Sequence, residues 1–319
     1  MRRRLPYALV LSCSIACSGP EGVDAGAGAG TDAALLDAAR DDAGPPMVEA
    51  FAALGANAEG IALGTSAAGA PALYVTTRDG RLARIGADGT VETHATVADP
   101  LGVAVRADGD LLVCGKDAGG AAVLFLVTRS GAVSTHVAAG PGGVPFGLTN
   151  FVAIAPDDSI VFSDSMANRV FRADADGSNV ALVTDAITYP NGLAFAPDGA
   201  TLFVASWDDE TVHALAFDRA SGTYGAPSPS IEGVANVDGV VAATDGTLVL
   251  VTSSRGILTA TPGSDETATL APTRAITLPA NGIFGDEAFG ATDLFIASLG
   301  QPDVIRVRTS LRGVALPVR

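Results

Sequence analysis

Short apolar segments alternate with turns of Gly, Asp and Ser from about residue 49 to the end of the chain. No helical period of apolar residues interrupts this alternation, which is typical of β-strands joined by tight turns. The segments form a unit that occurs six times: a first residue that is polar in five of the copies, an apolar strand, a turn and a second apolar strand. We call the first residue of each unit its anchor. The anchors are Glu59, Leu101, Asn150, Asn191, Asp238 and Asn281.

The anchors follow one another at intervals of 41 to 49 residues, which leaves room for four strands in each unit. Turn pairs fall where such strands must reverse, as at Asp198-Gly199 after a first strand and Asp176-Gly177 after a third. The pattern predicts an all-β protein, a six-bladed β-propeller of four-stranded antiparallel blades over residues 49–319, with an open β-solenoid as the alternative. Only 38 residues follow Asn281. Residues 48–54 are therefore expected to add a strand to the last blade and close the ring.

The N-terminus has the composition of an export signal. Three arginines precede an apolar stretch that ends at residue 16 and is too short to cross a bilayer. Ser14-Ile15-Ala16-Cys17 resembles the lipobox of bacterial lipoproteins, which predicts a signal peptide over residues 1–16 and lipidation of Cys17. Cys13 is a weaker competitor, and an ordinary secretory signal is the alternative. Residues 17–48, rich in Ala, Gly and Asp, are expected to form a flexible acidic linker.

This N-terminus predicts an exported protein that is lipid-anchored in the bacterial cell envelope, at the outer membrane or the periplasmic face. The lipid is its only expected contact with a membrane. A net charge of −16, from 19 basic and 35 acidic residues, excludes nucleic acid as a partner. Three cysteines, two of them in the first 17 residues, exclude an internal disulfide framework. We expect a monomer.

The anchors become neighbours in space if the chain is a propeller, because the first strand of every blade then runs in the same direction along the central channel. Five of the six anchors carry a side-chain oxygen, and Glu59 and Asp238 are carboxylates. Oxygen ligands with two negative charges suit a hard divalent cation such as Ca²⁺ or Mg²⁺. The simpler interpretation is that Asn-Gly and Asp-Gly pairs only form turns. Glu59 is not a turn-forming residue, which favours the cation.

Residues 49–319 resemble the superfamily of senescence marker protein 30, bacterial gluconolactonases and related calcium-dependent lactonases. The resemblance rests on Glu59-Gly60-Ile61, on Asn150, on the Tyr-Pro-Asn-Gly-Leu-Ala-Phe-Ala-Pro-Asp-Gly phrase of residues 189–199 and on Val237-Asp238-Gly239. It implies a metal site at Glu59, Asn191 and Asp238, with Asn150 beside both metal and substrate. It also implies one divalent cation as cofactor, Ca²⁺ foremost, with Mg²⁺, Mn²⁺ or Zn²⁺ as alternatives.

Several positions depart from the family pattern. Phe151 stands where many relatives have Asp, which makes Asn150 and Phe151 the candidate substrate-binding pair. No arginine near residues 144–149 matches the one with which animal gluconolactonases hold sugar hydroxyls. The three histidines, His94, His136 and His213, fall on third or outer strands, where surface or packing roles are expected.

Two further residues are placed by the strand pattern alone. Cys114 lies on an apolar second strand and is expected to be an inert core thiol. Trp207 follows the second strand of the fourth unit, and we expect it at a blade edge, near the end of the channel opposite the anchors.

These features favour a divalent-metal-dependent hydrolase that acts on a small lactone or related ester. The cation would polarise the carbonyl, and Asp238 or a metal-bound hydroxide would deliver water. Two alternatives stay open: a non-catalytic propeller that binds a ligand or an envelope protein, and a strictosidine-synthase-like or lyase activity on the same scaffold. Phosphate loops, paired zinc cysteines and a Gly-x-Ser-x-Gly elbow are missing from the sequence.

Overall fold

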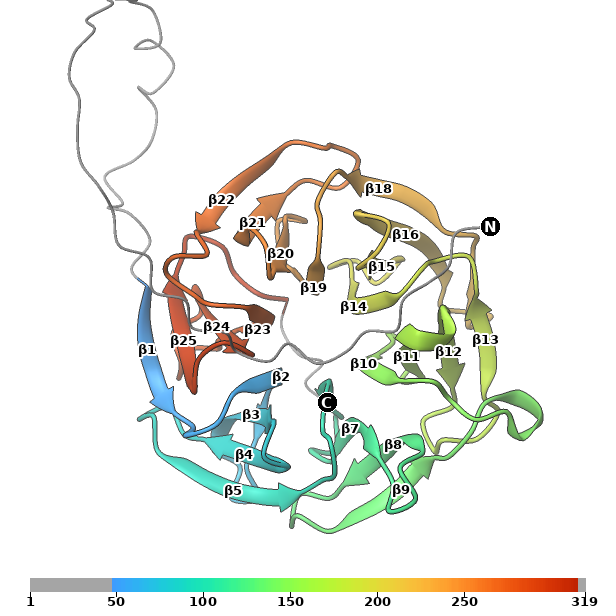
Figure 1. The fold of residues 1–319 in the computed structure, drawn as a ribbon, viewed down its shortest axis with the longest axis horizontal. Coiled ribbons are helices and arrows are strands. Elements are labelled where there is room, and N and C mark those ends of the chain that lie inside the picture. Colours follow the sequence, from blue (N-terminus) through green and yellow to red (C-terminus); the bar gives the residue numbers. More distant parts are fainter. Residues whose placement is uncertain (1–47, 315–319) are drawn as a thin grey trace, which may run out of the picture. The chain divides into compact units, whose positions relative to one another are not determined.

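A computed structural model describes residues 48–314 of the protein. The expected signal peptide, Cys17 and almost all of the acidic linker lie outside the described residues. Within them the chain forms six antiparallel sheets arranged as a ring around a central channel (Figure 1). The predicted six-bladed β-propeller is confirmed. Two short 3-10 turns, η1 (Pro141–Gly143) and η2 (Ser165–Ala167), are the helical elements of the described chain. Neither is long or apolar enough to span a membrane.

The first three blades each have four strands in sequential order, from the channel outward. Blade 1 contains β2 (Ala58–Thr65), β3 (Pro71–Thr77), β4 (Arg81–Ile85) and β5 (Val91–Thr96). Blade 2 contains β6 (Val103–Val105), β7 (Leu111–Lys116), β8 (Ala122–Val127) and β9 (Val133–Val137). Blade 3 contains β10 (Thr149–Ile154), β11 (Ile160–Asp164), β12 (Arg169–Ala173) and β13 (Ala181–Thr184).

Blade 4 departs from the predicted four strands. It contains β14 (Pro190–Phe195), β15 (Thr201–Ser206), β16 (Thr211–Asp218), β17 (Thr223–Tyr224) and β18 (Ser228–Glu232). Both β17 and β18 pair with the long strand β16. The outer strand is split between Tyr224 and Ser228, where Pro227 lacks the backbone N–H that a continuous ladder needs.

The last two blades return to four strands, and the ring closes as the sequence predicts. Blade 5 contains β19 (Val237–Ala242), β20 (Leu248–Thr252), β21 (Gly256–Ala260) and β22 (Thr267–Ala271). Blade 6 contains β23 (Pro279–Phe284), β24 (Asp293–Ser298), β25 (Asp303–Arg308) and the N-terminal β1 (Val48–Ala53). The pairing of β1 with β25, from Val48 opposite Val307 to Ala53 opposite Asp303, joins the two ends of the propeller.

The hydrophobic core lies between the blades. Each of six apolar clusters joins two neighbouring sheets, as where Leu112 and Leu124 of blade 2 meet Phe162 of blade 3. Second strands such as β7 are buried on both faces and are continuous apolar runs, whereas the outer strand β9 is largely exposed and carries polar residues. This packing fixes the first strand of every blade against the central channel.

Candidate functional site

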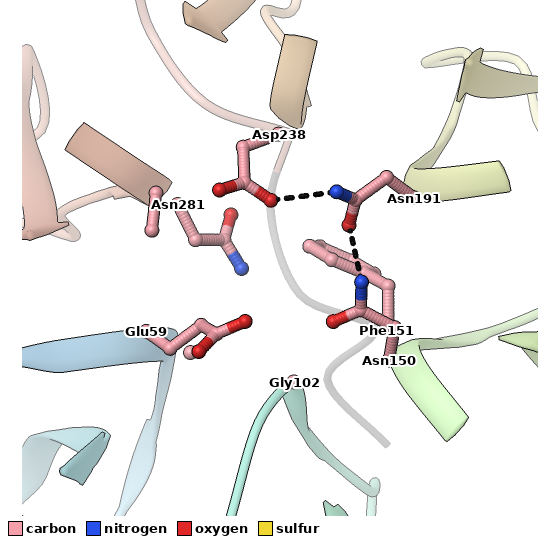
Figure 2. Close-up of a pocket in the computed structure, with 9 residues that line it drawn as sticks. Glu59, Gly102, Asn150, Phe151, Asn191, Asp238 and Asn281 are labelled. Carbon is pink, nitrogen blue, oxygen red and sulfur yellow. Dashed lines mark hydrogen bonds between the residues drawn. The ribbon is translucent and has the colours of Figure 1, made fainter. Parts of the chain in front are cut away.

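Five of the six anchors meet in one pocket at one end of the channel. The pocket is lined by residues of all six blades: Glu59, Gly60, Gly102, Asn150, Phe151, Asn191, Asp238, Ala280 and Asn281. Figure 2 shows the side chains of Glu59, Asn150, Asn191, Asp238 and Asn281 turned toward a common centre. All predicted site residues of the propeller are therefore together, and their roles stay predictions. The side chain of the sixth anchor, Leu101, packs instead into the core between blades 2 and 3.

Glycines allow the first strands to approach one another closely enough to form this pocket. In five of the six blades the residue after the anchor is glycine. A Cβ atom on Gly60 would lie 2.3 Å from the Leu101 carbonyl oxygen, and one on Gly192 would lie 2.6 Å from that of Asp238. A side chain at either position would collide with the backbone of the next blade. Blade 3 carries Phe151 at this position, and its ring also packs against the core between blades 3 and 4.

A chain of hydrogen bonds links the polar side chains of three blades. Asn150 Nδ2 donates to Asn191 Oδ1 at 3.0 Å, and Asn191 Nδ2 donates to Asp238 Oδ1 at 2.8 Å (Figure 2). Asn150 Nδ2 also donates to Ser165 Oγ at 3.0 Å, and that hydroxyl donates to the Pro190 carbonyl oxygen at 2.6 Å. All four side chains are buried. This network fixes the amide orientations, so that the Asn150 oxygen faces the centre of the pocket.

Two carboxylates share this buried space with one cationic partner. Arg78 Nη1 lies 3.1 Å from Glu59 Oε2. Burial raises the pKa of Glu59, although the Arg78 charge and hydrogen bond oppose the shift. Burial and the nearby negative charge of Glu59 raise the pKa of Asp238 well above its usual range, against the hydrogen bond from Asn191. With both carboxyls ionised, the pocket would carry more negative charge than Arg78 alone balances.

The donor set of the pocket fits a hard divalent cation. Its candidate ligands are carboxylate oxygens of Glu59 and Asp238 and amide oxygens of Asn150 and Asn191, with no sulfur or imidazole among them. A cation would offset the repulsion between the buried carboxylate of Asp238 and the partly buried carboxylate of Glu59. Asn191 Oδ1 already accepts one hydrogen bond, and its second lone pair leaves room for a ligand bond. Within residues 48–314 no group of three or more His, Cys, Asp or Glu side chains could hold a metal ion, so amide oxygens would have to complete the coordination.

Ser165 and Arg78 were missed by the sequence analysis, because both follow second strands rather than begin first strands. A polar residue directly after a buried second strand is the signal that could have found Ser165. Asn281 lines the pocket, and its Oδ1 accepts the Gly282 backbone N–H at 2.7 Å. We did not include it among the predicted ligands.

The placement of Trp207 corrects one expectation. We expected it near the far end of the channel, but its backbone N–H donates to the Tyr189 carbonyl oxygen at 3.1 Å, two residues before Asn191. The second strand runs antiparallel to the first and so returns to the mouth where the first began.

The expected positions of the three histidines and of Cys114 are confirmed. His94 and His136 lie on the outer strands β5 and β9, and His213 lies on the third strand β16. None of the three lines the pocket. Cys114 is fully buried, and burial raises the pKa of its thiol well above the usual range.

Solved structures of several activities share this architecture. The gluconolactonase of Xanthomonas campestris superposes with a TM-score of 0.68 at 22% identity, covering 85% of this chain and 96% of that one. A calcium-binding protein, regucalcin, from Agrobacterium tumefaciens gives 0.68 at 16% identity, covering 86% and 97%. A streptogramin B lyase gives 0.54 at 12% identity, covering 84% and 98%. At these identities the likeness establishes the fold alone.

Sequence comparison extends this result from fold to family. No curated protein sequence matches the chain. The family model for the SMP-30/Gluconolactonase/LRE-like region, however, matches residues 65–300, which is most of the propeller. The chain therefore belongs to the SMP-30/gluconolactonase/LRE-like family.

Proposed function

We propose that the protein is a divalent-metal-dependent hydrolase of a lactone or related ester, with Ca²⁺ as the preferred ion. The observation that carries the proposal is the pocket itself, where the Asn150–Asn191–Asp238 chain faces a second, partly buried carboxylate, Glu59. Family membership supports a lactonase-type reaction, and the neighbour described as a gluconolactonase has the same fold. The neighbour described as calcium-binding supports the choice of ion.

Glu59, Asn150, Asn191 and Asp238 are the residues that would hold the ion, which when bound supplies a Lewis acid for the carbonyl of the substrate. Asp238 is the proposed general base. It takes a proton from water as the water oxygen forms a bond to the carbonyl carbon. The bond from that carbon to the ring oxygen then breaks, and Asp238 returns the proton to the leaving oxygen.

The neighbouring side chains would orient these groups. The 2.8 Å hydrogen bond from Asn191 holds the Asp238 carboxylate in one position, and Ser165 holds the Asn150 amide. Arg78 opposes the rise in the pKa of Glu59 that burial causes, and a bound cation would oppose that rise further. Asn150 and Phe151 would contact the substrate, because both line the pocket on the blade 3 side.

The setting of this activity is also a proposal. The lipobox-like segment and the acidic linker support an exported, monomeric enzyme that is tethered by lipid on Cys17 to the bacterial cell envelope, at the outer membrane or the periplasmic face. The net charge of −16 supports a small neutral substrate rather than nucleic acid.

Hydrolysis of a panel of lactones by the purified protein, with and without a chelator, tests the function. We expect turnover that stops with the chelator and returns with Ca²⁺. Asp238→Asn should turn over lactones at least a hundredfold more slowly, in the range expected for loss of a general base, roughly 10²–10⁴. Calcium binding without turnover of any lactone would contradict the proposal and favour a binding module.

A further inference from the structure

The longest connection between blades in the described chain leads into the strand that carries Asn150 of the candidate site. Residues 138–148 join β9 to β10 and end two residues before Asn150, whereas the other inter-blade connections have four to seven residues. Every side chain in this connection is apolar or absent, in the sequence Ala-Ala-Gly-Pro-Gly-Gly-Val-Pro-Phe-Gly-Leu. Exposed loops normally carry polar residues. None of its residues lines the pocket, so a fully apolar loop here indicates contact with an apolar group that extends beyond the pocket.

Two contacts hold this connection in place. Phe146 is buried, with its ring 5.3 Å from each of Phe162 and Phe171. On the other side, the Asp164 carboxylate is 1% exposed. It accepts the Gly147 N–H at 2.9 Å and the Leu148 N–H at 2.7 Å. The loop is thus preorganised, which reduces the entropy lost when a ligand binds.

The Asp164 contact differs from its equivalents in other blades. In blades 4 and 6 the last residue of the second strand is a serine, and its hydroxyl donates to a carbonyl oxygen of the preceding connection. In blade 3 the corresponding residue is Asp164, which accepts two backbone N–H groups instead. A carboxylate and a pair of N–H donors make a stronger contact than one hydroxyl. Blade 3 therefore uses the buried Asp164 carboxylate to fix the shape of its loop.

Exposed apolar side chains remain on this fixed framework. Val144 of the loop is 49% exposed, and Met166 of η2 is 68% exposed. Met166 lies against the loop, since a Cβ atom on Gly147 would be 3.1 Å from Met166 Cβ. Met166 also follows Ser165, which touches Asn150 of the site. We call the loop 138–148 and Met166 the apolar wall.

We propose that the apolar wall binds a hydrocarbon substituent on the substrate ring, so that the substrate class is an alkyl-substituted lactone and not a polyhydroxylated sugar lactone. The inference rests on the proposed function and gives it a substrate class. A sugar ring needs side-chain hydrogen-bond partners, and the loop 138–148 has none to offer. An alkyl chain gains about fourfold in affinity for each methylene that the wall removes from water.

The test compares kcat/KM of the full-length protein for γ-decanolactone, γ-butyrolactone and glucono-δ-lactone. We expect γ-decanolactone to be preferred over each of the others by at least tenfold. Met166→Gln keeps the side-chain length but adds a polar end, and it should lower the ratio of decanolactone to butyrolactone about tenfold. Leu182→Gln is the matched control, because Leu182 is also exposed but lies on the outer strand β13. It should keep the wild-type ratio.

A binding measurement tests ligand binding by the apolar wall separately from lactone hydrolysis. The probe is the lactam analogue of γ-decanolactone, 5-hexyl-2-pyrrolidinone, and the readout is the fluorescence of Trp207, the single tryptophan of the sequence. We expect binding that Met166→Gln weakens and Leu182→Gln does not. If the lactam binds in this way but no lactone is hydrolysed, the proposed hydrolase function is wrong, and binding of a hydrocarbon substituent by the apolar wall is still supported. Three results would overturn the proposal that the apolar wall binds a hydrocarbon substituent: preference for glucono-δ-lactone, an unchanged decanolactone-to-butyrolactone ratio in Met166→Gln, or no lactam binding.

Discussion

Replacing Gly192 with alanine should force blades 4 and 5 apart directly beside the candidate site. The new Cβ atom would lie 2.6 Å from the Asp238 carbonyl oxygen and 2.8 Å from the Val240 backbone nitrogen. Both are backbone atoms, so no rotamer change can relieve the collision. Ordinary contact begins at 3.4 Å, which requires a separation of about 0.8 Å between the two strands.

The cost of this separation follows from overpacking in a close-packed interior. Such substitutions typically destabilise by about 1–3 kcal/mol, and we expect the upper end because neither neighbour can rotate away. For a domain of this size, about 3 kcal/mol corresponds to a fall in Tm of roughly 6–12 °C. The same movement separates Asn191 from Asp238, and a misplacement of about 1 Å can cost a hundredfold in rate. Lactone turnover should therefore fall about a hundredfold.

Thermal unfolding followed by circular dichroism, together with lactone hydrolysis, measures both effects. Gly225→Ala is the matched control, since a Cβ atom there meets its nearest neighbour, Ala216 Cβ, at an ordinary 3.5 Å. The control should melt within about 2 °C of the wild type and keep its activity. If Gly192→Ala behaves like the control, the close approach of the first strands does not hold the site together, and the reasoning is refuted.

Three further outcomes are expected. Cys17→Ser should move the protein from the membrane fraction to the soluble fraction of cells, and unchanged fractionation would contradict lipidation. Phe51→Ala should lower the free energy of unfolding by about 2 kcal/mol, because β1 would pack more weakly on Phe289 and Phe295. This is less than the roughly 3–5 kcal/mol expected for a fully buried Phe, since Phe51 is only partly buried. Cys114 should resist alkylation at pH 8 until denaturant is added, because its raised pKa and burial withhold the thiolate; rapid labelling of the native protein would argue against this.

The sequence predicted the fold because repetition carries most of the information about a propeller. Six anchors at a regular spacing set the number of blades, and the short last unit indicated that residues 48–54 would complete it. The extra strand of blade 4 escaped prediction because a two-residue strand has no periodicity to detect. Trp207 was misplaced because its position depends on counting strand reversals, and an antiparallel second strand returns to the mouth.

The site was predictable as far as it depends on first strands. Glu59, Asn150, Asn191 and Asp238 each begin one, so closing the ring was enough to bring them together. Arg78 and Ser165 come from the ends of second strands, and their contacts depend on how neighbouring blades twist against one another. The hydrogen bonds between Asp164 and the loop 138–148 could not be predicted for the same reason. No sequence spacing indicates which backbone N–H groups a buried carboxylate will accept.

Calorimetric titration of the metal-free, full-length protein with Ca²⁺ tests the central claim most directly, which is that the anchors at the channel mouth hold one divalent cation. We predict one ion per chain and a gain in stability of about 2.7 kcal/mol at a hundredfold excess of ion over Kd. Asp238→Ala should remove both, because it leaves Glu59 as the single carboxylate of the pocket. Absence of Ca²⁺, Mg²⁺, Mn²⁺ and Zn²⁺ binding to the wild type, or equal binding by Asp238→Ala, would contradict the account.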